Sequence, residues 1–141
     1  MDQNKFDILK TELLLTQQQM DKYDQLSTTI KTWAVTLWVA VSGWALQTDK
    51  KTILVLGIVL VIAFWIFDSM NKTFRMNYKK RRDEVAGVLG ELFNTGKINK
   101  DSNAPQLPIH DLQKFMENII TPHVALPYLF FIVVSVVLLF I

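Results

Sequence analysis

Long uncharged apolar runs, set apart by charged stretches, most constrain how this chain of 141 residues can fold. Three such runs cover residues 32–48, 52–67 and 124–141. A helix needs roughly 20 apolar residues to cross about 30 Å of hydrocarbon, and each run lies near the lower limit. The second and third runs lack the polar face that a surface helix of a soluble protein needs. The runs therefore predict an all-α integral membrane protein with three transmembrane helices.

The distribution of basic residues predicts how the chain is oriented in the membrane. Only Asp49, Lys50 and Lys51 separate the first two runs, so these spans are expected to form a tight hairpin, residues 31–68. Four Lys and Arg residues precede the first span, two lie in the turn, and nine lie between the second and third spans. Basic residues concentrate on the cytoplasmic side of membrane proteins. We therefore expect the N-terminus in the cytoplasm and the C-terminus at the outer face.

Two charged segments predict a cytoplasmic helical stalk. Residues 1–30 carry apolar side chains at alternating spacings of three and four, like a coiled-coil seam, with polar faults at Thr16 and Ser27. No proline interrupts this segment or residues 69–95, which end at a predicted C-cap, Gly96. Each is expected to continue a span as one helix, and the hairpin would pair the two helices antiparallel. The predicted packing residues are Phe6, Leu9, Leu13, Met20, Phe74, Val85 and Leu92.

The seam of residues 1–30 is open to two interpretations. It belongs either to a surface helix packed on the rest of the protein, or to a helix that meets a partner helix in this chain or in another copy. The next connection, residues 96–121, is predicted to hold a polar loop with two prolines and a short helix at the membrane surface. Pro122 then redirects the chain into the third transmembrane helix, residues 122–141.

Small and weakly polar residues follow one face of the first span at the roughly 3.6-residue period of a helix. Such a face has two interpretations. Small residues let transmembrane helices approach one another closely. Alternatively, the face lines the water-filled pore of a homo-oligomer, because three short spans of one chain cannot enclose a pore. The candidate pore-lining residues are Thr32, Thr36, Ala40, Gly43 and Gln47.

A basic cluster follows the second span, and its ligand is also open to two interpretations. Such clusters commonly contact anionic lipids, at about 1 kcal/mol per residue near the surface. Alternatively, the cluster binds a soluble anion such as a nucleotide second messenger. The candidate residues are Arg75, Tyr78, Lys79, Lys80, Arg81 and Arg82. Asp68, Lys72 and Arg75 share one helix face and are interpreted as solvated charges where the helix leaves the membrane.

No catalytic arrangement emerges from the sequence. The chain has no cysteine, and its two histidines, His110 and His123, stand in no metal-ligand spacing. No phosphate-binding loop or nucleophile elbow is present. We therefore expect no enzyme activity, no cofactor and no bound metal. The net charge of +2 gives no reason to expect nucleic acid as a partner.

The hairpin, the aromatic–Asp end of its second span and the basic helix after it resemble the SLATT-type membrane effectors. These are bacterial proteins of two or three spans found beside nucleotide-second-messenger enzymes in antiphage systems. The resemblance covers roughly residues 29–92. It is carried by Phe64, Trp65, Asp68, Arg75, Tyr78 and Arg82. It implies an oligomeric pore in the bacterial inner membrane that permeabilises or depolarises the cell when a signal arrives.

Two functions follow from these observations. The first is an oligomeric pore or channel, held closed until it is triggered, with the first span at its wall. The alternative is a non-conducting membrane adaptor or regulatory subunit whose stalk recruits or inhibits a cytoplasmic partner protein. Enlarging or charging Thr36 should change conductance in a pore. Disrupting Leu9, Leu13 or Val85 should abolish partner binding by an adaptor.

Overall fold

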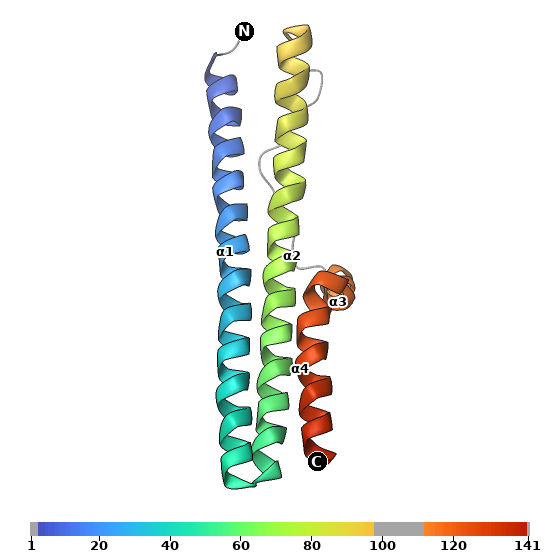
Figure 1. Cartoon of the computed structure of the whole chain (residues 1–141). Helices are drawn as coiled ribbons and strands as arrows, with labels where there is room; N and C mark the ends of the chain where they lie inside the picture. Colours follow the sequence, from blue (N-terminus) through green and yellow to red (C-terminus); the bar gives the residue numbers. More distant parts are fainter. Residues whose placement is uncertain (1–2, 98–111, 141) are drawn as a thin grey trace. The chain divides into compact units, whose positions relative to one another are not determined.

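A computed structural model describes residues 3–97 and 112–140, which form only helices and their connections. The helices are α1 (Gln3–Thr48), α2 (Lys51–Thr95), α3 (Leu112–Ile120) and α4 (Pro122–Phe140) (Figure 1). The predicted all-α class is therefore confirmed for the described residues. Most of the predicted loop between α2 and α3, together with His110, lies outside them.

Two left-handed residues end the long helices. Asp49 has a φ of 52° in the turn between α1 and α2, a conformation that Asp tolerates better than most residues. Gly96 has a φ of 68°, and its N–H donates a 2.9 Å hydrogen bond to the Leu92 carbonyl, which caps α2. Neither α1 nor α2 is interrupted along its length, so the charged and the apolar segments of each belong to one continuous helix.

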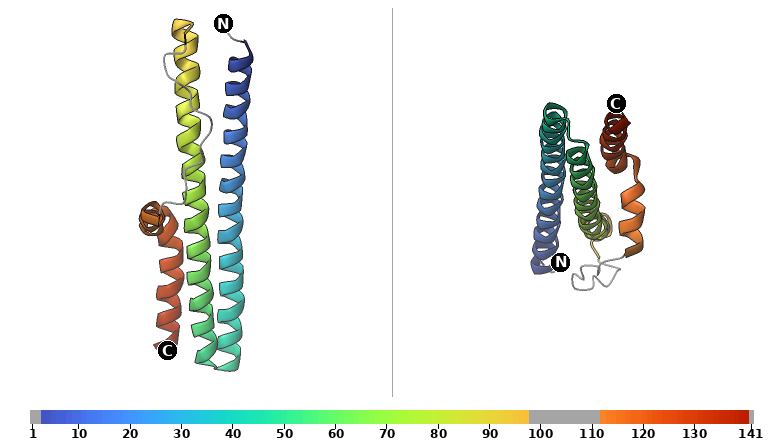
Figure 2. Two further views of the ribbon diagram at one scale, coloured as in Figure 1. Left: turned by 180° about the vertical axis from the view of Figure 1, so that it is seen from behind. Right: turned by 90° about the horizontal axis from the view of Figure 1, so that it is seen from below.

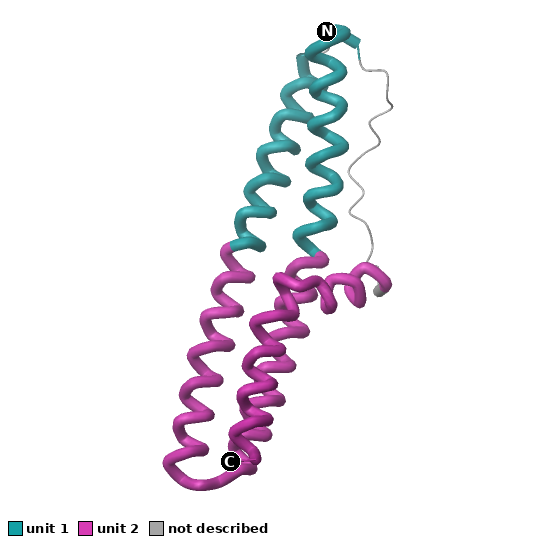
Figure 3. The backbone as a smooth tube through the Cα atoms, turned by 45° about the vertical axis from the view of Figure 1, so that its right-hand side comes forward, with its two compact units in different colours: residues 1–24, 74–111 teal, residues 25–73, 112–141 magenta. Residues whose placement is uncertain are grey.

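The helices divide between two compact units (Figure 3). The stalk unit consists of residues 3–24 of α1 and 74–97 around the end of α2, and the hairpin unit consists of residues 25–73 and 112–140. Both long helices therefore contribute to both units.

The stalk unit is an antiparallel pair of helices held by an apolar seam. Its buried cluster consists of Leu9, Val85 and Val88, with Leu13 and Leu89 packed against them. Further along α1, the Tyr23 ring stacks on Phe74 and contacts Tyr78, with ring centroids 6.1 and 5.6 Å apart. The seam of residues 1–30 therefore faces α2 of the same chain.

The hairpin unit packs α4 against α1 and α2. Its buried centre brings together Ala34, Val61 and Tyr128, one residue from each of these helices. Aromatic contacts surround this centre: the Trp38 and Phe131 rings lie 4.8 Å apart and the Trp65 and Tyr128 rings 6.4 Å apart. The short helix α3 lies crosswise to α4 (Figure 2).

Among the described residues, α2 and α4 are long and apolar enough to cross a membrane. Only 28% of the most apolar stretch of α2 and 22% of that of α4 are buried within the chain, so most of each stretch is uncovered in a single copy. The predicted span at residues 32–48 is not among these helices. Three tryptophans, several threonines and Gln47 lower its hydropathy. The prediction of three spans is thus supported for two of them.

Candidate functional site

A buried carboxylate on α2 joins three helices of the hairpin unit. The side chain of Asp68 is only 1% exposed. Its Oδ1 accepts a hydrogen bond from the Ser27 hydroxyl at 2.6 Å, and its Oδ2 accepts one from the Tyr128 hydroxyl at 3.3 Å. The Lys31 ammonium lies 3.6 Å from Oδ2. One carboxylate therefore has partners on α1 and α4 at the same time, and we call these four residues the Asp68 cluster.

The Asp68 cluster satisfies the physical requirements of a buried charge. An ionised carboxylate away from water is costly unless it is both paired and hydrogen-bonded, and here one cation and two hydroxyls meet that need. The Lys31 side chain is 35% exposed, so this cation is only partly removed from its surroundings. Removing one partner of a buried pair commonly costs about 3–5 kcal/mol. The cluster therefore fixes how α1, α2 and α4 pack.

The interpretation of Asp68 as a solvated charge is wrong, because neighbouring helices bury it. It also does not pair with Lys72 or Arg75 along its own helix. The Lys72 ammonium instead lies 2.7 Å from both the Thr121 hydroxyl and Nε2 of His123. An ammonium only donates, so this contact requires an unprotonated Nε2 on His123.

A second polar layer joins α2 to α3. The buried amide of Asn118 donates to the buried Thr73 hydroxyl at 3.0 Å. The indole N–H of Trp65 donates to the Ile119 carbonyl at 3.1 Å. Inside α2, the Ser69 hydroxyl, which has no exposed surface, donates to the Trp65 carbonyl at 2.8 Å. These contacts fix α3 against the same segment of α2 that carries Asp68.

Polar contacts also hold α4 to the hairpin at two further levels. The indole N–H of Trp38 donates to the buried Ser135 hydroxyl at 2.8 Å. Near the turn, the Lys51 ammonium donates to the Leu139 carbonyl at 2.9 Å. Interhelical hydrogen bonds of this kind are characteristic of helices that associate in a membrane. The helix α4 is thus an integral part of the hairpin unit rather than an appended anchor.

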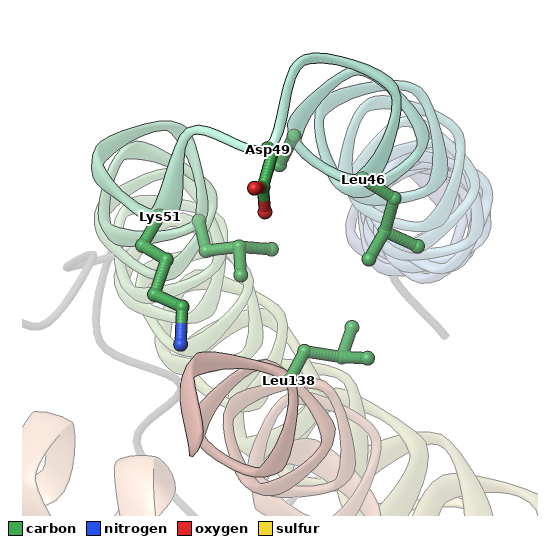
Figure 4. A pocket seen from close by; sticks show the side chains of 6 residues that line it. Leu46, Asp49, Lys51 and Leu138 are labelled. Atoms are coloured by element: carbon green, nitrogen blue, oxygen red, sulfur yellow. The ribbon is translucent and has the colours of Figure 1, made fainter. Parts of the chain in front are cut away.

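A small open cleft lies at the turn end of the hairpin unit (Figure 4). Leu46 of α1 and Leu138 of α4 line it, together with Asp49 of the turn and Lys51, the first residue of α2. Its remaining lining residues, Ala45 and Leu54, are apolar. One acid, one base and apolar walls do not make a convergent set of catalytic groups.

The predicted pore-lining residues share the exposed face of α1. Ala34, Ser42 and Ala45 are buried on the opposite face, against the rest of the hairpin unit. A side chain added at Gly43 would meet nothing within 4 Å. Within one copy, the small face therefore packs on no other described part of the chain. The residues on this exposed face are Thr32, Thr36, Ala40, Gly43 and Gln47.

The threonine hydroxyls on this face are satisfied by their own helix. Thr32 donates to the Thr28 carbonyl at 2.9 Å, and Thr36 donates to the Thr32 carbonyl at 2.8 Å. Such bonds leave the hydroxyl oxygen able to accept a further hydrogen bond from water or from another chain.

The predicted anion-binding cluster is largely neutralised inside the stalk unit. Nε and Nη2 of Arg81 donate to the Glu12 carboxylate at 2.7 and 3.2 Å, and Nη1 lies 3.4 Å from Glu84. The hydrogen bond to Glu12 holds the pKa of Arg81 above its ordinary value. Since this guanidinium is already bidentate with a carboxylate, an anionic ligand would have to displace Glu12.

The other members of the basic cluster do not converge on one site either. Arg82 pairs with Asp83 at 2.7 Å, and Arg75 pairs with Asp24. In the described part of the chain, Lys79 and Lys80 are the basic members without an ion pair.

Residues 3–97 and 112–140 hold no group of three or more His, Asp or Glu that gathers as metal ligands do. The partners of Asp68 were not predicted from the sequence. The available signal was Ser27, a polar fault at a seam position, which points a hydroxyl toward the paired helix.

The fold and the Asp68 cluster define a class: an all-helical chain with two helices able to cross a membrane, locked together by a buried carboxylate. Comparisons with protein-family models, with curated proteins and with solved structures found no match. The resemblance to SLATT-type effectors stays a prediction.

Proposed function

We propose that this protein is a homo-oligomeric pore or channel of the bacterial inner membrane, and an effector of the SLATT type that permeabilises the membrane when triggered. One observation carries the proposal. The small, weakly polar face of α1 that includes Thr36 and Gly43 is exposed, while the opposite face of α1 is packed. In a bilayer such a face is better satisfied by water or by another copy than by lipid.

In this proposal, residues 32–48 of α1 also cross the membrane, in addition to α2 and α4. A helix that lines water needs less apolar surface than one surrounded by lipid, so its modest hydropathy agrees with a place at the pore wall. We place the stalk unit in the cytoplasm because basic residues are in excess outside the turn, and such residues concentrate on the cytoplasmic side. Lys31 and Asp68 then lie together at the cytoplasmic end of the hairpin unit.

The trigger in this proposal acts on the stalk unit. Because Arg81 and Arg82 are held by carboxylates, the members of the basic cluster open to an anionic lipid or a nucleotide second messenger are Lys79 and Lys80. A polyanion that also displaced Glu12 from Arg81 would alter the pairing of α1 with α2. Such a ligand would therefore link binding to the packing of the stalk.

Ion flux from liposomes tests the proposal. Thr36→Trp would fill a lumen lined by this face. Val35→Trp is the matched control, because Val35 is also exposed but lies about 100° away around α1. We expect flux from the wild type and from Val35→Trp, and little flux from Thr36→Trp at equal oligomer content. Equal flux from both variants would contradict the placement of α1 at the pore wall.

The adaptor alternative is supported by a different observation. The stalk unit exposes large apolar side chains, among them Ile8, Leu15 and Phe93, the last of which is 91% exposed. Exposed aromatic and aliphatic side chains of this kind are typical of protein contact sites. Phe93→Ser should then abolish capture of a cytoplasmic partner protein while flux stays unchanged. Lost flux with intact partner capture would favour the pore.

A further inference from the structure

The short helix α3 buries a polar side chain and exposes two large apolar ones. Its polar side chain Asn118 is buried and bonded to Thr73, while Met116 and Ile120 are 53% and 71% exposed. Half-buried Phe115 and Ile119 flank them on the same side of the helix. Soluble proteins bury the apolar face of such a helix. Here Asn118 is buried, while part of the apolar side, Met116 and Ile120, is left uncovered.

The orientation of α3 is set by its junction with α4. Figure 1 shows α3 nearly end-on where α4 is seen along its length, and the right view of Figure 2 reverses this. The Thr121 hydroxyl donates to the Asn118 carbonyl at 2.7 Å, and the Thr121 carbonyl accepts from Val124 and Ala125 at 2.9 Å each. Pro122 follows as the first residue of α4, where proline suits a helix start. The hydrogen bonds of Thr121 thus hold the crosswise junction between α3 and α4.

We propose that α3 is a membrane-surface anchor whose apolar side enters the boundary between headgroups and acyl chains. The proposal rests on the proposed membrane location: if α4 crosses the bilayer, a helix crosswise to it lies in the membrane plane. Amphipathic helices bind the interface in this position. The occupant of the exposed face is the lipid bilayer.

Two observations favour lipid over a second protein as this occupant. First, the exposed apolar side of α3 is followed directly by the exposed apolar side chains of α4, among them Leu126, Phe130 and Val133. In the proposed arrangement, lipid covers both. Second, the described side chains of α3 include one cation, Lys114, and one anion, Glu117, so the helix offers no net charge to a charged partner. Its insertion should therefore depend on apolar burial and not on anionic lipid.

Spin-label accessibility tests this anchor, because the full chain has no native cysteine. Single nitroxide labels would be placed at Met116→Cys and Ile120→Cys in phosphatidylcholine vesicles, with and without phosphatidylglycerol. Glu117→Cys is the control on the polar side of α3. Phe130→Cys on α4 and Phe93→Cys on the stalk unit give the lipid and water references. Circular dichroism checks that each variant keeps its helix content.

We expect labels at Met116 and Ile120 to be accessible to oxygen and protected from a water-soluble nickel complex, in both lipid mixtures. The label at Glu117 should stay accessible to nickel. Nickel accessibility at Met116 equal to that at Phe93 would overturn the anchor. Protection of the Met116 label from both oxygen and nickel would also overturn it, because this result indicates that protein covers the helix. A water-exposed Phe130 label would instead overturn the proposed membrane location, so the two failures are distinguishable.

Discussion

The Ser27 hydroxyl of α1 donates a 2.6 Å hydrogen bond to the Asp68 carboxylate of α2, which is almost completely buried. The same carboxylate accepts a hydrogen bond from Tyr128 of α4. A side chain that must satisfy partners on two other helices allows only one register among the three. The Asp68 cluster is therefore the feature of the hairpin unit whose perturbation should have the clearest consequences.

Ser27→Ala should lower the free energy of unfolding by about 1.5–3 kcal/mol, the usual range for a hydrogen bond to a charged group. Chemical unfolding in detergent micelles measures this. Thr29→Ala is the matched control, since Thr29 is exposed and bonds only to the Gln25 carbonyl of its own helix; it should change stability by less than about 0.5 kcal/mol. In a double-mutant cycle with Asp68→Asn, additive losses would show that the two side chains do not interact.

Tyr128→Phe isolates the hydroxyl from the ring. The variant loses the hydrogen bond to Asp68 but keeps the ring stacked on Trp65, so we expect a loss of about 1 kcal/mol. Tyr128→Ala also removes a buried ring and should cost about 3–5 kcal/mol. Thermal unfolding in detergent ranks the two. An unchanged stability of Tyr128→Phe would mean that packing alone fixes α4 and that the carboxylate contact contributes nothing.

Arg81→Met should destabilise the stalk unit, because it leaves Glu12 half-buried without its bidentate partner. We expect a loss of about 1–3 kcal/mol, and almost none for Lys80→Met, whose side chain is exposed. The exchange Glu12→Arg with Arg81→Glu tests the pairing itself and should recover part of the loss. If the exchanged variant is less stable than Arg81→Met alone, the contact is not an ion pair that contributes to stability.

Tyr23 should lose its proton at higher pH than a free tyrosine. Its pKa lies above the ordinary value of 10.0, mainly because burial disfavours the phenolate and also because of the neighbouring Tyr78. A raised pKa in the folded state means a stabilising contribution that is complete below pH 10.0 and is lost as the pH rises through the folded pKa. The difference in tyrosinate absorbance between wild type and Tyr23→Phe isolates this titration. A midpoint at or below the ordinary value would contradict the burial.

The helices were predictable because their signals are local. Long apolar runs and unbroken charged segments predicted α1 and α2, and Gly96 marked the end of α2 through its left-handed conformation. The seam containing Leu9 and the tight hairpin predicted packing against residues 69–95, and Leu9 lies in one buried cluster with Val85 and Val88. Periodicity indicates which side of a helix is buried, and here the short turn after α1 also indicated which helix buries it.

The Asp68 cluster was not predictable in the same way. Spacing along α2 pointed to Lys72 as the neighbour of Asp68, whereas the actual partners are 41 and 60 residues away in Ser27 and Tyr128. Tertiary packing outweighed the i,i+4 relationship, which contributes only about 0.2–0.5 kcal/mol. The basic cluster shows the same effect, since Arg81 is held by Glu12 from the paired helix.

The most direct test of the proposed pore is the ion selectivity of Thr36→Asp oligomers in planar bilayers. A carboxylate at the pore wall attracts cations, so the account predicts a reversal potential shifted toward the cation equilibrium potential. Val35→Asp at matched oligomer content should leave the reversal potential unchanged. A persistent current whose selectivity is the same in Thr36→Asp and wild type would contradict the placement of α1 at the pore wall.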